Sequence, residues 1–240
     1  MSVTCNCACS IRAASPVPVE FTDDVIVTGL VAYGDSDVIV RLFSRSRGRL
    51  AAFARKARAS RRRFPLLSAP ATGRARYQES RTQLYELLEL DPHPRILALA
   101  ADLRALGHAS YLCELVERLL LEEDPAPEVF ALIDIGFGAI CDSGPSARLL
   151  RAVELKLLLH TGYLPDLSQD DGVLSPEGRA AARALVLAEL PALPMVAEPL
   201  LREVSRVFAS HLRRLGGPPL KSVEFLRSLE PAVALRAGSG

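Results

Sequence analysis

The sequence lacks long hydrophobic runs and most of the patterns that mark enzymes. No apolar stretch approaches the about 20 residues that a membrane-spanning helix needs, and the first 20 residues lack the apolar core of a secretory signal. We therefore expect a soluble intracellular protein, located in the cytoplasm. The four histidines are scattered without an HExxH pair, and no glycine-rich phosphate loop carries a lysine. These absences predict a protein that is not an enzyme, with no catalytic residue and no cofactor.

Cysteine is scarce, and its distribution gives no disulfide framework. Three of the five cysteines form the run Cys5, Cys7 and Cys9 near the N-terminus. No second ligand cluster follows at a zinc-like spacing, which favours a disordered leader without metal. A metal-binding protein that uses these cysteines stays open as an alternative. Cys113 and Cys141 lie in helical patterns, where small buried core residues are expected.

Acidic residues are missing from one long stretch of the chain. Between Val38 and Gln78 there are twelve arginines and lysines and no aspartate or glutamate. The chain as a whole has 29 basic and 28 acidic residues, so the remainder carries 17 basic against 28 acidic residues. Like charges at this density repel one another, and a phosphate backbone is the commonest partner that relieves the repulsion. Nucleic acid is therefore favoured over a solvated basic loop that only raises solubility.

From Val25 to Leu90 the hydrophobic pattern has the period of two that is typical of strands. Short alternating or β-branched runs are separated by turn signals at Gly48, Pro65 and Pro70. Five short strands within about 70 residues indicate a small barrel, for which an OB-fold is the economical choice.

From about Ile96 the period becomes helical. Apolar stripes recur over residues 112–120, 129–140, 149–158 and 200–212, and Ser175-Pro176-Glu177 reads as a helix start. A last amphipathic segment is expected to end before Pro231. The predicted fold class is thus α+β, an N-terminal OB-fold β-barrel followed by an all-α helical domain. We expect a disordered leader over 1–20, a nucleic-acid-binding domain over 21–95, a helical domain over 96–231 and a disordered tail over 232–240.

The densest basic segment supplies the candidate DNA-binding side chains. Six cations fall within nine residues: Arg55, Lys56, Arg58, Arg61, Arg62 and Arg63. Guanidinium groups bind phosphate oxygens bidentately and stack on bases. Arg74 and Arg76 add charge on the following strand, and Tyr77 is the surface candidate for stacking on unpaired bases. Phe43 and Phe53 are expected to point into the barrel.

Several motifs resemble those of the RecO family of bacterial recombination mediators. Residues 27–37 resemble its first hairpin, and RKARASR at 55–61 resembles its K-G-x-R-x-x-x-S element. The segment ELKLLLHTGYLP at 154–165 is similar to F-E-x-x-L-L-x-x-L-G-Y-x-P, and PLKSVEFL at 219–226 is similar to L-x-S-x-E-F-L. These motifs agree with the family in order and spacing over residues 22–230.

The resemblance implies a non-catalytic protein of DNA repair and recombination, which is expected to be associated with the nucleoid. Such proteins bind single- and double-stranded DNA, anneal complementary strands, and work with RecR to load RecA onto DNA coated by single-stranded-DNA-binding protein. DNA binding is carried onto Arg55, Lys56, Arg58 and Arg61 by matched position. Arg62 and Arg63 are added on charge alone.

The resemblance also implies that the protein binds the acidic, hydrophobic C-terminal tail of the single-stranded-DNA-binding protein. Lys156 and Lys221 are the candidate cations for that tail. Many members of the family carry a four-cysteine zinc site after the Gly-Tyr-x-Pro motif, but residues 164–178 contain no cysteine. We therefore expect no metal there. A protein-interaction scaffold with a solubilising basic loop remains the alternative function.

Overall fold

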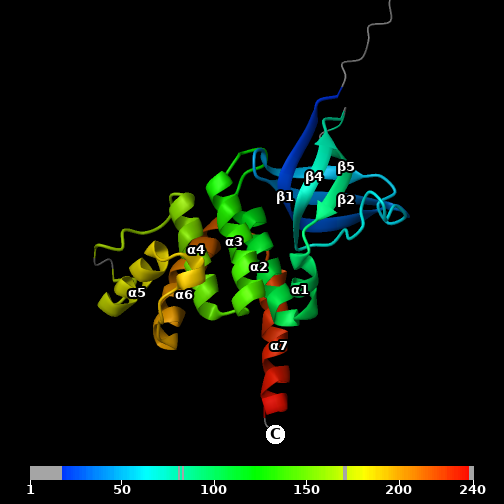
Figure 1. The fold of residues 1–240 in the computed structure, drawn as a ribbon. Coiled ribbons are helices and arrows are strands. Elements are labelled where there is room, and N and C mark those ends of the chain that lie inside the picture. Colours follow the sequence, from blue (N-terminus) through cyan, green and yellow to red (C-terminus); the bar gives the residue numbers. More distant parts are fainter. Residues whose placement is uncertain (1–17, 81, 83, 170–171, 238–240) are drawn as a thin grey trace, which may run out of the picture.

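The computed structural model describes residues 18–80, 82, 84–169 and 172–237, with a β half followed by an α half (Figure 1). The strands are β1 (Glu20–Tyr33), β2 (Asp37–Ser44), β3 (Gly48–Ala54), β4 (Ala71–Gln78) and β5 (Tyr85–Pro92). They close into a barrel in the order β1-β2-β3-β5-β4, and β4 pairs back onto β1. Only β3 and β5 run parallel among these pairs. This connectivity confirms the OB-fold that the sequence predicted.

Strand β1 is long enough to pair with two neighbouring strands of the barrel. Its first part pairs with β4 and its second part with β2, and the register shifts between Val27 and Gly29. Such a bulge bends a strand and increases its twist, which barrel closure requires. A Cβ at Gly29 would lie 2.5 Å from Nη2 of Arg41. Glycine at the bulge therefore leaves room for this guanidinium to cross the strand.

The prediction that Phe43 and Phe53 point into the barrel is wrong. Along β2 the barrel core takes Val40 and Leu42, so the alternation of a strand turns Phe43 outward. Phe43 is nevertheless fully buried, because the helical half covers it and its ring centroid lies 5.5 Å from that of Phe130. Phe53 lies on the outer face of β3 and stays partly exposed.

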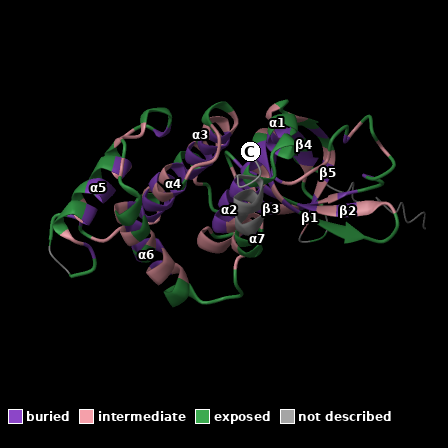
Figure 2. Cartoon of the chain, turned by 90° about the horizontal axis from the view of Figure 1, so that it is seen from below, coloured by how far each residue is buried: buried purple, intermediate pink, exposed green. Residues whose placement is uncertain are grey.

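The α half consists of seven helices and one short 3₁₀ turn within the described residues. They are α1 (Arg95–Ala101), α2 (Leu103–Leu119), α3 (Pro127–Ser143), α4 (Ala147–His160), α5 (Pro176–Leu187), η1 (Leu190–Ala192), α6 (Glu198–Leu215) and α7 (Lys221–Ala237). The predicted start of α5 is confirmed, since Ser175 Oγ accepts a hydrogen bond from the Gly178 amide at 3.0 Å. The buried residues follow the inner faces of α2, α3 and α4 (Figure 2).

Helix α7 continues past Pro231, where the sequence predicted its end. A proline removes one backbone hydrogen bond and kinks a helix, but it does not always stop one. Residues 232–237, assigned to a tail, therefore belong to α7. The remaining tail residues and most of the proposed leader, with Cys5, Cys7 and Cys9, lie outside the described residues.

The barrel and the helices meet through both apolar and polar contacts. Ile26 joins Phe43 in the larger apolar cluster, which otherwise belongs to the helices. Beside it, Glu117 of α2 forms an ion pair with Arg49 at 3.0 Å, and both side chains are mostly buried. Gly48 has φ +72°, and a Cβ there would lie 2.1 Å from the Asp124 carbonyl oxygen. The chain that follows α2 is thus pressed against the β2–β3 turn.

The two described cysteines differ in their surroundings. Cys113 is buried between α2 and β1, as predicted, and its Sγ lies 3.8 Å from the Val27 carbonyl oxygen. Burial raises the pKa of its thiol, which is therefore protonated and unreactive. Cys141 is only partly buried and packs against the larger apolar cluster, so the prediction of a buried core residue holds for it only in part.

Candidate nucleic-acid interface

The basic loop, defined here as residues 55–70, joins β3 to β4 and has a defined shape. Ala57 and Phe64 reach back into the barrel core and are both buried. The Arg58 amide donates to the Ser36 carbonyl oxygen at 3.1 Å. Main-chain and apolar contacts therefore hold the loop against one end of the barrel. They fix the main chain from which the cationic side chains project.

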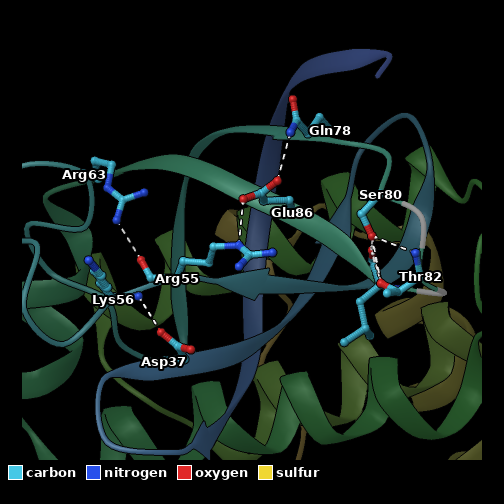
Figure 3. Close-up of polar contacts among 9 residues, drawn as sticks. Asp37, Arg55, Lys56, Arg63, Gln78, Ser80, Thr82 and Glu86 are labelled. Atoms are coloured by element: carbon cyan, nitrogen blue, oxygen red, sulfur yellow. Dashed lines mark hydrogen bonds and ion pairs between the residues drawn. The ribbon is translucent and has the colours of Figure 1, made fainter. Parts of the chain in front are cut away.

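Arg63 stabilises this loop from within. Its Nη2 donates to the Arg55 carbonyl oxygen at 2.7 Å (Figure 3). Its Nε donates to Ser60 Oγ at 3.2 Å. On the other side, the Lys56 amide donates to Asp37 Oδ1 at 2.7 Å. The guanidinium of Arg63 is therefore hydrogen-bonded within the loop, and its main role is to hold the loop in shape.

Four cations of the loop project into solvent with free charge. The side chains of Lys56, Arg58, Arg61 and Arg62 are exposed and form no hydrogen bond or ion pair with any described residue. Their ordered backbone lowers the entropy that would be lost on binding an anion. This part of the loop is suited to contact a phosphate backbone.

Acidic residues from outside the basic stretch neutralise several of its other arginines. Arg55 pairs with Glu86 at 3.1 Å, and Arg76 pairs with Glu20 at 3.1 Å and with Glu89 at 3.6 Å. Further pairs join Arg41 and Arg49 to Glu117, and Arg45 to Asp24. The stretch contains no acidic residue, but these arginines are compensated in the fold, because β1, β5 and α2 bring carboxylates that are distant in sequence.

The outer face of β4 has mixed charge. Arg74 faces Asp24 across the β1 ladder and Asp91 across the β5 ladder. With Arg76 already paired, this surface offers a phosphate less positive charge than the sequence suggested. Arg74 and Arg76 are therefore weaker DNA candidates than the exposed cations of the basic loop.

The prediction that Tyr77 stacks on bases at the surface is wrong. Its side chain is 0% exposed, and its ring lies 5.6 Å from those of Phe21 and Tyr85. The hydroxyl shares a hydrogen bond of 3.2 Å with Ser44 Oγ, and burial raises the pKa of Tyr77. Since Arg76 points outward, strand alternation turns its neighbour Tyr77 inward.

A groove on another face of the barrel was not found from the sequence. It has a volume of about 1310 Å³ and lies between the outer faces of β1, β2 and β3 and the described residues 79, 80, 82 and 84 of the β4–β5 loop. Its lining includes Tyr33, Ile39, Phe53, Arg55, Gln78 and Glu86. These residues come from five strands or strand ends, so only the barrel brings them together. Tyr33, an aromatic residue at the end of a strand, was the one local signal.

The groove and the basic loop are continuous, because Arg55 belongs to both. Tyr33 is 57% exposed, and its ring meets the Phe53 ring edge to face at a centroid distance of 5.4 Å. The Arg55 guanidinium lies 5.6 Å from the centre of the Phe53 ring. Exposed aromatic rings beside a guanidinium provide a stacking platform for unpaired bases.

A polar bridge crosses the groove beside this platform. Glu86 Oε1 accepts from Arg55 Nε at 3.1 Å, and Glu86 Oε2 accepts from Gln78 Nε2 at 2.9 Å (Figure 3). Beyond the bridge, Ser80 and Thr82 hydrogen-bond to each other at 2.8 Å within the β4–β5 loop. The groove therefore combines a cationic end, an aromatic floor and the carboxylates of Glu86 and Glu79.

Replacing Tyr33 by alanine is expected to weaken binding to a single strand about tenfold, since stacking on an aromatic ring contributes roughly 1–3 kcal/mol per base. Affinity for duplex DNA should change little, because its bases are already stacked. Fluorescence anisotropy with labelled oligonucleotides measures both constants. Tyr163→Ala is the matched control, because Tyr163 is also 57% exposed but follows α4. An equal loss for single and double strands would contradict a stacking role.

The two lysines proposed for an acidic tail lie on different pairs of helices. Lys156 of α4 donates its ammonium to the Val186 carbonyl oxygen at the end of α5, and burial lowers its pKa. Lys221 is exposed at the start of α7. That helix is attached to α2, where Glu114 Oε2 accepts from the Ser222 amide at 3.1 Å. Lys156 is thus engaged in packing, whereas Lys221 remains available.

Within the residues that the structure describes, no three His, Cys, Asp or Glu side chains converge as metal ligands would. No helix in this part of the chain is long and apolar enough to cross a membrane.

A five-stranded barrel with an aromatic groove and a basic loop has the architecture of the oligonucleotide-binding barrels. The family models for the N-terminal and C-terminal domains of recombination protein O match residues 19–93 and 100–172, which together are more than half of the chain. The chain belongs to the RecO family.

Two relatives illustrate the similarity. The DNA repair protein RecO of Myxococcus xanthus is 35% identical over 148 residues, which cover 60% of each chain. That of Anaeromyxobacter dehalogenans strain 2CP-C is 36% identical over 168 residues, which cover 67% of this chain and 66% of the relative. The chain thus aligns with slightly less than two thirds of the length of these relatives.

Proposed function

We propose that this protein is a cytoplasmic, non-catalytic DNA-binding mediator of DNA repair and recombination that anneals complementary single strands. The observation that carries the proposal is the continuity of the exposed, unpaired cations of the basic loop with the aromatic groove. One surface can therefore hold phosphates at the loop and unpaired bases at the platform. Family membership and the names of the relatives support the same function.

The physical basis of annealing is charge neutralisation. Two complementary strands repel each other through their phosphates, and bound cations reduce this repulsion. Arg58, Arg61 and Arg62 are exposed without internal partners, so they can hold a strand through its backbone. Backbone contacts leave the base edges free to pair with a second strand.

The proposed DNA-binding residues differ in role. Lys56, Arg58, Arg61 and Arg62 contact phosphates, and Arg55 lies between the loop and the base platform. Arg63 holds the loop in shape. Arg74 and Arg76 provide weaker, long-range attraction because carboxylates surround them.

The proposed partners are RecR, RecA and the single-stranded-DNA-binding protein. The acidic, hydrophobic tail of the last protein needs a cation beside apolar surface. Lys221 meets this need better than Lys156, because it is exposed and lies on the same helix as the partly exposed Phe225.

A fluorescence assay with two complementary labelled strands tests the proposal. The protein should accelerate annealing, and the acceleration should fall steadily as the salt concentration rises, because counterions compete for the phosphates. The same assay with strands coated by the single-stranded-DNA-binding protein, intact or without its tail, tests the partner. No acceleration, or acceleration that salt leaves unchanged, would favour the scaffold alternative instead.

A further inference from the structure

The structure assigns to Glu86 the recognition of an unpaired guanine in the groove. This inference rests on the proposed DNA-binding function and names the base that the groove prefers. A carboxylate repels phosphates, so its presence in a nucleic-acid groove favours contact with base edges that carry hydrogen-bond donors. Its side chain is 29% exposed, so a base can reach it.

The hydrogen-bonding capacity of Glu86 is half used. An ionised carboxylate offers about four acceptor positions, roughly two on each oxygen. Arg55 takes one position on Oε1, and Gln78 takes one on Oε2. One position therefore remains on each oxygen, and the two internal donors fix the orientation of the carboxylate (Figure 3).

Guanine matches the two remaining positions better than the other bases. Its Watson–Crick edge presents two adjacent donors, N1–H and the N2 amino group, which fit the two oxygens of a carboxylate. Adenine and cytosine present one amino donor beside a ring acceptor that would face the second oxygen. Thymine presents one imino donor between two carbonyl oxygens. Repulsion between acceptors therefore disfavours these three bases.

The aromatic platform lies on the same face as the carboxylate. Phe53 and Glu86 are register partners across the parallel β3–β5 pair, so their side chains share the outer face of the barrel. Tyr33 and Arg55 both contact the Phe53 ring. A base that stacks on Tyr33 or Phe53 can thus place its edge against Glu86, while the unpaired cations of the basic loop attract the neighbouring phosphates.

The test compares short thymidine oligomers that differ only in one central base. The native protein should bind the oligomer with a central guanine about fivefold more tightly than those with adenine, cytosine or thymine. This factor is at the low end of the base discrimination expected from a bidentate hydrogen-bonded contact, because the groove is open to solvent. Hypoxanthine lacks the N2 amino group and should lose most of the preference. 7-Deazaguanine keeps both donors and should retain it. Fluorescence anisotropy competition measures the four-base comparison and both analogues.

Two variants examine the residue itself. Glu86→Gln and Glu86→Ala should bind all four oligomers with affinities within about a twofold range, because the acceptor pair for guanine is lost. Their overall affinity should not fall, because the variants also lack a carboxylate that repels phosphates. Glu89→Gln is the matched control, since it makes the same charge change on β5 outside the groove lining. This control should keep the guanine preference.

Equal affinity of the native protein for all four oligomers would overturn the role of Glu86, and so would a guanine preference that survives in Glu86→Ala. Either result would leave salt-sensitive DNA binding intact. The proposed function would fail differently, through the absence of salt-sensitive binding to every oligomer by the native protein.

Discussion

A variant with Arg58, Arg61 and Arg62 all replaced by alanine should bind a single strand about 100-fold more weakly at low salt, if each lost contact costs about 1 kcal/mol. The three guanidinium groups are exposed and have no partner among the described residues, so their removal breaks no internal contact. The slope of log Kd against log salt should also fall by about 2 for a single strand. Anisotropy titrations at several salt concentrations give both values.

Arg63 is left in place because its guanidinium holds the loop through Arg55 and Ser60. The matched control replaces Arg206, Arg213 and Arg214 of α6, which are also exposed, and therefore removes the same charge from the helical half. This control should retain nearly native affinity and salt slope. Equal losses in both triple variants would indicate a general charge effect and would contradict a specific basic loop.

Tyr77→Ala should lower the free energy of unfolding by about 3–5 kcal/mol, the usual cost of removing a buried aromatic side chain. The ring is fully buried between Phe21 and Tyr85, so its loss leaves a cavity in the barrel. Tyr77→Phe should cost only about 1 kcal/mol, for the hydrogen bond to Ser44. Urea unfolding followed by circular dichroism measures both changes.

DNA affinity separates this structural role from a stacking role. Under conditions where Tyr77→Phe is fully folded, its affinity for a single strand should equal that of the native protein. A Tyr77→Ala variant with native stability and weak DNA binding would restore the interpretation of Tyr77 as a surface residue.

Some features of the site could be predicted from residues that are adjacent in the sequence. The cations between Arg55 and Arg63 are adjacent in sequence and follow a strand pattern, so the loop and its charge could be predicted together. The position of Tyr77 was also readable, because it alternates with Arg74 and Arg76 along β4. The neighbouring arginines favoured a surface position, whereas the period of two along β4 places Tyr77 inside the barrel.

Other features depended on contacts between distant segments. Phe43 and Phe53 both face outward, but only the position of α3 decides that Phe43 is covered while Phe53 remains in the groove. Distant strands likewise decide which arginines are compensated by a carboxylate, since Glu86 lies beside Arg55 and Glu20 beside Arg76. Sequence separation hides such pairs because strand order in the barrel is not the order of the chain.

Periodicity, charge density and motif spacing are local properties of a chain. The two halves of the protein, its basic loop and its family resemblance could therefore be predicted from the order of the residues. Which cations stay unpaired, and where an unpaired base could bind, depends on contacts between segments that are distant in the sequence. Barrel closure places the ends of β3 and β5 side by side and so brings Phe53 and Glu86 together. The acid-free stretch is therefore not uniformly positive in the folded protein: its free charge is concentrated on one loop at the edge of an aromatic groove.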